Sequence, residues 1–257
     1  MNSLVIKLCL LALFASANGT IAQTNSFRVA AASDLKFALD SVIRIFEDET
    51  SSEVTVTYGS SGKLFEQISN GAPFDIFFSA DLAYPEKLQR ARLTISEPKV
   101  YGTGRLVVWS SVLDPSDLKM ESLVNMKGKV AIANPQHAPY GKRAVEAMLF
   151  YNVYEKVKTR LVLGENISQT AQYLYSGAAD IGIIALSVAL SPPMKKLGGN
   201  YYIIPDESHL PLQQAYVLLS RARNNSSLSK FDAFLSTDRA RGIFRIYGFS
   251  VPSDKLE

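Results

Sequence analysis

Apolar residues recur with helical spacing in a long segment near the start of the chain. These positions are Leu35, Ala38, Leu39, Val42, Ile43 and Phe46. Intervals of three and four residues predict an amphipathic helix with one buried face. Similar patterns predict helices over residues 64–68, 141–151, 168–175, 228–235 and 239–247.

Short apolar runs rich in β-branched and aromatic residues alternate with these helices. The runs expected as strands are 27–30, 54–58, 74–78, 106–109, 130–133, 180–184, 201–204 and 215–219. Strands that alternate with helices are typical of a parallel sheet covered by helices. The pattern therefore predicts an α/β fold.

Two crossing points divide this α/β pattern into two lobes. Glycines and prolines gather near residues 101–104 and 205–211, where a hinge would fit. We expect a discontinuous first lobe of residues 23–103 plus 209–257, with a second lobe of residues 104–208 inserted. Ligands of open α/β sheets bind beyond the carboxyl ends of the strands, so two facing lobes predict a ligand cleft between them.

Residues 1–22 have the features of a cleaved signal peptide. Lys7 precedes a short apolar run, Leu8–Phe14, and small residues follow up to Ala22. The run is too short to span a bilayer, so we expect export to the periplasm with cleavage after Ala22. The alternatives are cleavage after Ala17 and a buried N-terminal helix. Cys9 is the only cysteine of the 257 residues, so the mature chain contains no disulfide.

Charge and metal-ligand content exclude several functions. The chain has 27 Lys and Arg against 24 Asp and Glu, and these charges are mixed along it, which disfavours binding to nucleic acid. The only two histidines, His137 and His209, lie far apart and no cysteine of the mature chain accompanies them. A protein metal site or a histidine-based catalytic triad is therefore not expected.

Two serines stand where a predicted strand gives way to a predicted helix. Ser33 follows the first strand, and Ser61 follows the second within Gly59–Gly62. Helix starts present unpaired N–H groups and the positive end of the helix dipole, so two of them with hydroxyls favour an oxyanion. Both serines also suit simple N-caps. The spacing around Lys63 does not match a phosphate-binding P-loop.

Seven short motifs occur in one order along nearly the whole mature chain. They are Ala30–Leu35, Gly59–Gly62, Gly71–Phe77, Asn134–Gly141, Gly164–Ile167, Pro205–His209 and Ile243–Phe249. In this set and order the chain resembles the molybdate-binding proteins of bacterial ABC transporters, which have a two-lobed periplasmic-binding-protein type II fold. Each motif alone is weak, and their shared order carries the resemblance.

The resemblance implies a set of hydrogen-bond donors to the bound oxyanion. Ser33 and Ser61 match the family serines that donate through Oγ and backbone N–H. Tyr140 and Ile167 match residues that donate through backbone N–H alone. Molybdenum would thus be present only as the bound oxyanion.

The sequence departs from the family at one donor. Many members have a tyrosine hydroxyl where this chain has Ala185. The backbone N–H of Asp34 is expected to replace it, as in some members. The Asp34 carboxylate either caps the helix start and points away, or accepts a proton from a protonated ligand.

The resemblance implies an extracytoplasmic solute-binding protein that captures molybdate, and also tungstate, and passes it to a membrane ABC permease. It implies a monomer without cofactor or enzymatic activity. Two alternatives remain open: a binding protein for another ligand, such as sulfate or a metal-bearing compound, and a serine-dependent hydrolase. The hydrolase lacks support because no G-x-S-x-G elbow occurs.

Overall fold

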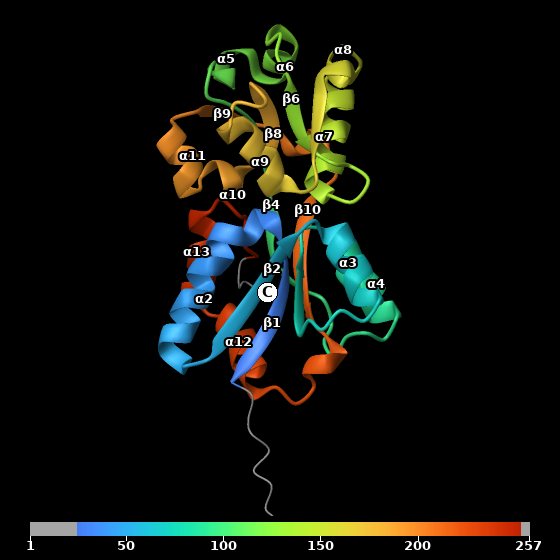
Figure 1. The fold of residues 1–257 in the computed structure, drawn as a ribbon, viewed down its shortest axis with the longest axis vertical. Helices are drawn as coiled ribbons and strands as arrows, with labels where there is room; N and C mark the ends of the chain where they lie inside the picture. The colour runs from blue at the N-terminus through green and yellow to red at the C-terminus, as the bar shows by residue number, and fades with distance from the viewer. Residues whose placement is uncertain (1–24, 253–257) are drawn as a thin grey trace, which may run out of the picture.

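A computed structural model describes residues 25–252, which form two lobes around two five-stranded sheets. The predicted signal peptide lies outside the described residues. Figure 1 shows the lobes one above the other. The first sheet contains β1 (Ser26–Ala32), β2 (Glu53–Gly59), β3 (Ile76–Ser79), β4 (Lys99–Gly104) and β10 (Leu212–Leu218). The second contains β5 (Leu106–Ser110), β6 (Val130–Ala133), β7 (Leu161–Gly164), β8 (Ile181–Ala185) and β9 (Asn200–Ile203).

Both sheets are mixed, whereas the alternation of strands and helices indicated a parallel sheet. In the first, with order β2-β1-β3-β10-β4, β1 pairs in parallel with β2 and β3, but β10 is antiparallel to β3 and β4. The reason is the double crossing: β4 carries the chain toward the second lobe and β10 brings it back. In the second sheet, with order β7-β6-β8-β5-β9, β5 is likewise antiparallel to its neighbours.

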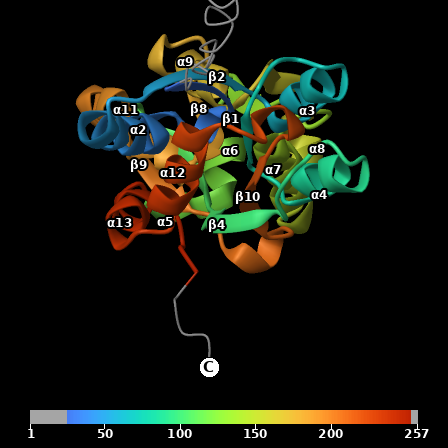
Figure 2. The same cartoon turned by 90° about the horizontal axis from the view of Figure 1, so that it is seen from below.

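Helices cover both faces of the first sheet. Helices α2 (Lys36–Thr50), α12 (Ser226–Leu235) and α13 (Asp238–Ile246) lie on one side, with α3 (Ser61–Ser69) and α4 (Ala83–Arg90) on the other (Figure 2). Alternate residues of β1 enter different cores: Phe27, Val29 and Ala31 pack with the first group, and Ala30 packs with the second. A strand buried on both faces explains the continuous apolar run in the sequence.

The long amphipathic helix is confirmed as α2. Its predicted apolar face is buried from Ala38 to Phe46, while Leu35 belongs to a short 3-10 helix, η1 (Ser33–Leu35), that precedes it. Gly248, with φ of +81°, follows α13 in the left-handed conformation that commonly ends helices.

The second lobe is built from shorter elements. Its helices are α5 (Pro115–Leu118), α6 (Ser122–Asn125), α7 (Pro139–Phe150), α8 (Tyr154–Val157), α9 (Ile167–Tyr175), α10 (Leu186–Ala189) and α11 (Pro192–Leu197). Its 3-10 helices are η2 (Lys119–Glu121) and η3 (Lys158–Arg160), and η4 (Asp206–Ser208) follows β9. A further 3-10 helix, η5 (Ser220–Ala222), follows β10 in the first lobe. The core includes Trp109 of β5, together with the fully buried strands β6 and β8.

The passages between the sheets occur close to the expected hinge positions. Residues 101–104 form the end of β4, and the chain enters β5 after the single residue Arg105. The return runs from β9 through η4 to β10. The exact lobe boundaries stay a prediction. Between residues 25 and 252, no helix combines the length and apolar character that a membrane crossing requires.

Candidate functional site

A small pocket lies between the two lobes where four helices begin. Its lining residues are Ala32, Ser33, Asp34, Gly59, Ser60, Ser61, Ala80, Ala138, Pro139, Tyr140 and Ile167. The structure therefore brings together all five residues that the resemblance implies as ligand donors. Whether each of them touches a ligand stays a prediction.

Neighbouring parallel strands place the two serines of the first lobe side by side. Ala32, the last residue of β1, pairs with Gly59, the last residue of β2. The 3-10 helix η1 begins at Ser33 and α3 begins at Ser61. Because the carboxyl ends of parallel strands meet at one sheet edge, both helix starts face the same space.

The second lobe repeats this arrangement. Ala133 at the end of β6 pairs with Gly164 at the end of β7, and the following segments lead into α7 and α9. These helix starts contribute Tyr140 and Ile167 to the pocket. Gly141 allows α7 to start against β6, because a Cβ there would lie 2.0 Å from the carbonyl oxygen of Ala133.

Ser33 and Ser61 each accept a backbone hydrogen bond at Oγ. The N–H of Ala80 donates to Ser61 Oγ over 3.0 Å, and the N–H of Ser168 donates to Ser33 Oγ over 3.4 Å. A hydroxyl that accepts in this way keeps its own proton for another acceptor. Both side chains are therefore oriented as O–H donors.

Most backbone N–H groups in the first turn of α9 already have a hydrogen-bond partner. The N–H of Ser168 goes to the serine hydroxyl just described, and that of Gln169 goes to Asn166 Oδ1 over 3.0 Å. The N–H of Thr170 goes to Asn166 O over 3.0 Å. Within residues 25–252, the N–H of Ile167 has no partner, and Ile167 lines the pocket.

The starts of α3 and α7 also have backbone N–H groups without a partner in the described part of the chain. The N–H of Gly62 donates to His137 O over 2.9 Å, which leaves the N–H of Ser61 as the first free donor of α3. In α7, Pro139 has no N–H, so Tyr140 carries the first donor. Neither Ser61 nor Tyr140 donates its N–H to any described residue. Three backbone N–H groups thus remain available from helix starts of both lobes.

The pocket holds no side-chain cation. No Lys, Arg or His occurs among its lining residues. Its positive potential must come from the helix N-termini, where unpaired N–H groups and the helix dipoles favour an anion. The arrangement suits a ligand that accepts many hydrogen bonds and carries negative charge.

Asp34 is the one carboxylate in the pocket lining. It is 1% exposed, and the amide nitrogen of Gln214 donates to its Oδ2 over 2.8 Å and contacts Tyr140 OH at 3.0 Å. Burial raises the pKa of Asp34 to about 6, and hydrogen bonds from Gln214 and Tyr140 oppose that rise. Its Oδ1 has no hydrogen-bond partner among the described residues.

Direct contacts between the lobes surround the pocket. Ser168 Oγ donates to Ser33 O over 3.0 Å, and Ser187 Oγ donates to Asp34 O over 2.8 Å. Ser60 Oγ lies 2.9 Å from His137 Nδ1, and burial lowers the pKa of His137. The structure is therefore in a closed arrangement, with each lobe bonded to the other.

Sequence reasoning missed these closing contacts and the Gln214 contact. Ser60 belongs to the Gly59–Gly62 motif, but nothing in the sequence indicates its contact with His137. Ala185, where a family tyrosine is absent, is the buried last residue of β8 and does not line the pocket. Among residues 25–252, no cluster of three His, Cys, Asp or Glu residues could hold a metal ion.

Comparison with known proteins agrees with this geometry. A family model described as a bacterial extracellular solute-binding protein matches residues 27–250. The molybdate-binding protein ModA of Rhodobacter capsulatus is 35% identical over 208 residues, which cover 80% of each chain. The chain belongs to the ModA family of bacterial extracellular solute-binding proteins. ModA of Azotobacter vinelandii is 31% identical over 234 residues, covering 90% of this chain and 92% of its own.

A solved structure shows the same two-lobed fold. The periplasmic molybdate-binding protein of Azotobacter vinelandii superimposes with a TM-score of 0.81 at 29% identity, covering 88% of this chain and all of that one. The resemblance stated from the motifs and the two-lobed α/β fold are confirmed. Membership of the ModA family also confirms the expectation of a solute-binding protein rather than an enzyme.

Proposed function

We propose that this ModA-family protein captures molybdate, and also tungstate, between its lobes and passes it to a membrane ABC permease from the periplasm. The names of the relatives support molybdate as the ligand. Molybdenum enters this site only as part of the oxyanion. The observation that carries the proposal is the pocket itself, where neutral donors from both lobes converge without any side-chain cation.

The donor set matches a tetrahedral dianion. Ser33 and Ser61 offer hydroxyl protons from the first lobe, while Tyr140 and Ile167 offer backbone N–H groups from the second. Molybdate and tungstate at neutral pH carry no proton, so every oxygen can accept a hydrogen bond. These four residues offer only donors to the ligand, so they disfavour hydrogen phosphate, whose proton would need an acceptor.

Asp34 is the one group that could change this selectivity. Its free Oδ1 is an acceptor when the carboxylate is ionised. If Oδ1 met the proton of hydrogen phosphate, the site would accept that ion as well. Phosphate binding that Asp34→Asn removes would assign this role to the carboxylate.

The test is calorimetric titration of the mature protein at pH 7.5 with molybdate, tungstate, sulfate and phosphate. We expect one-to-one binding of molybdate and tungstate, with no heat from sulfate or phosphate at the same concentrations. Binding of sulfate in preference to molybdate would replace the proposed ligand with another oxyanion of the same geometry. No binding of any of the four would overturn the proposal.

A further inference from the structure

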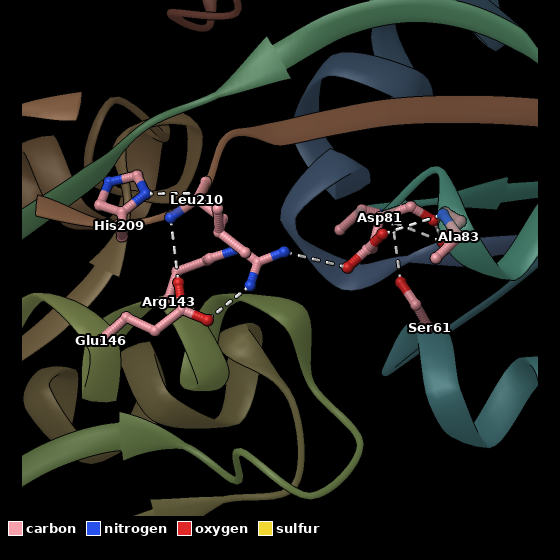
Figure 3. A network of polar contacts seen from close by, with 9 residues as sticks. Ser61, Asp81, Ala83, Arg143, Glu146, His209 and Leu210 are labelled. Atoms are coloured by element: carbon pink, nitrogen blue, oxygen red, sulfur yellow. Dashed lines mark hydrogen bonds and ion pairs between the residues drawn. The ribbon is translucent and has the colours of Figure 1, made fainter. Parts of the chain in front are cut away.

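A buried arginine joins the lobes beside the pocket. Arg143 of α7, with its side chain 7% exposed, places one guanidinium nitrogen 3.4 Å from Asp81 Oδ2 and another 2.7 Å from Glu146 Oε1. Glu146 belongs to the same helix, whereas Asp81 follows β3 in the first lobe. Figure 3 shows the guanidinium between these two carboxylates.

Asp81 is held firmly on the first lobe and lies next to the pocket. Its Oδ1 accepts from the N–H of Ala83 over 2.9 Å, and its backbone exchanges hydrogen bonds with Ser79 Oγ. The N–H of the preceding residue, Ala80, donates to Ser61 Oγ over 3.0 Å. Asp81, which contacts Arg143, therefore directly follows the residue whose N–H orients the Ser61 hydroxyl.

Glu146 connects the same arginine to the segment that crosses between the lobes. Its Oε2 accepts from the N–H of Leu210 over 3.0 Å, and Leu210 lies between η4 and β10 (Figure 3). Arg143 therefore contacts one carboxylate of its own lobe, Glu146, and one carboxylate of the first lobe, Asp81.

We propose that Arg143 and Asp81 form a latch that holds the lobes closed over the captured oxyanion and slows its release. The inference rests on the proposed function. Arg143 does not line the pocket, so it acts as a positioning residue: it lies one turn after Tyr140 on α7 and draws that helix start toward the first lobe.

The latch acts on the closed state because only closure brings its two halves together. When the lobes separate, Arg143 keeps Glu146 as its partner, whereas Asp81 loses Arg143 and gains water. Breaking the Arg143–Asp81 contact should therefore raise the dissociation rate and leave the association rate nearly unchanged. Loss of one partner of a desolvated charge pair acts mainly on dissociation.

The chain offers a matched control in a second ion pair between the lobes. Lys63 of α3 and Glu165 of the second lobe lie 3.0 Å apart, but their side chains are 44% and 50% exposed. Exposed pairs contribute little to stability. Glu165→Gln removes one negative charge near the pocket, as Asp81→Asn does. Any change in the long-range attraction of the anion is therefore common to both variants.

The experiment measures release of isotopically labelled molybdate from the mature protein during a chase with unlabelled molybdate. We expect Asp81→Asn to raise the dissociation rate about tenfold, and Glu165→Gln to raise it less than about threefold. Asparagine keeps an oxygen for the N–H of Ala83, so the turn stays intact. Arg143→Gln should act like Asp81→Asn, and the double variant should release molybdate no faster than the faster single variant.

Three results would overturn the latch. Asp81→Asn and Glu165→Gln could raise the dissociation rate equally, or the effects of Asp81→Asn and Arg143→Gln on that rate could multiply in the double variant. The third is a slower association rate as the main change. If Arg143→Gln does not fold, the comparison of Asp81→Asn with Glu165→Gln decides alone. Failure of the unaltered protein to bind molybdate in calorimetry would instead count against the proposed function.

Discussion

The two lobes build their halves of the pocket from the same backbone arrangement but with different donors. In each lobe, two parallel strands end in register and lead into helices, β1 and β2 in the first and β6 and β7 in the second. The first lobe contributes the hydroxyls of Ser33 and Ser61 together with backbone. The second contributes N–H groups of Tyr140 and Ile167, whose side chains do not donate to the ligand in the proposed site.

This difference determines how each half can be altered. A hydroxyl is removed by replacing one side chain, so the first lobe should respond to serine-to-alanine changes. A backbone donor survives any replacement that leaves the helix start in position. The second lobe should respond only when α7 or α9 is displaced.

The largest effect is expected from Gly141→Ala. A Cβ at Gly141 would lie 2.0 Å from the backbone oxygen of Ala133, so the start of α7 must shift and carry the N–H of Tyr140 away. We expect molybdate affinity to fall at least about 1,000-fold in calorimetry. The charged ligand loses the hydrogen bond from Tyr140, and the shifted start of α7 also disturbs the contact of the Gly62 N–H with His137 O that joins the lobes.

Gly242→Ala in α13 is the control, since a Cβ there meets no atom within 4 Å. It should bind molybdate like the unaltered protein. Normal affinity in Gly141→Ala, with a folded circular dichroism spectrum, would show that the second-lobe donors are not placed by α7.

Asp34→Asn should change stability in a pH-dependent way. Burial raises the pKa of Asp34 from 3.8 to about 6 in the folded chain. Between these values the folded chain keeps a proton that the unfolded chain releases, so the free energy of unfolding falls as the pH rises from about 4 to about 6. Above about pH 7, where the folded carboxyl is also ionised, the cost is constant at about 3 kcal/mol, the full effect of the pKa difference.

Thermal unfolding across this pH range measures the effect. The Asn variant should lack the contribution of Asp34 and unfold about 5–10 °C above the unaltered protein at pH 7.5. Asp48→Asn, at an exposed position of α2, serves as the control. A lower midpoint for Asp34→Asn at pH 7.5 would mean that the ionised carboxylate stabilises the first lobe.

The hydroxyls of the first lobe come next. Ser33→Ala and Ser61→Ala should each weaken molybdate binding by about 2 kcal/mol, roughly 30-fold, because each removes one hydrogen bond to a charged ligand. Calorimetry at pH 7.5 measures the change, with Ser69→Ala at the exposed end of α3 as a control. Unchanged affinity in both variants would remove the hydroxyls from the proposed site.

How much the sequence predicts differs between these features. The amphipathic face of α2 and the buried strands follow from local spacing, and the structure confirms them. Strand β7 was missed because it is a four-residue edge strand with Leu163 47% exposed, which leaves too little pattern. The antiparallel directions of β5 and β10 depend on the double crossing, which local periodicity does not report.

In the site, too, some features follow from the local sequence and others only from the fold. Ser33 and Ser61 could be proposed from residue type, since hydroxyls at helix starts suit an anion. Tyr140 and Ile167 came from the family resemblance alone, because a backbone donor leaves no mark in side-chain chemistry. The contacts of Gln214 with Asp34 and of Arg143 with Asp81 join residues far apart in the chain, so only the folded lobes reveal them.

The smallest effect is expected where the side chain of a backbone donor is trimmed. Ile167→Val removes one methyl group from a residue that is 4% exposed, which costs about 1 kcal/mol of stability but leaves its N–H at the start of α9. We expect molybdate affinity to weaken less than about threefold in calorimetry, well below the loss in Ser61→Ala. A loss equal to that of Ser61→Ala would show that the second lobe also holds the ligand through a side chain, and the contrast between the lobes would fail.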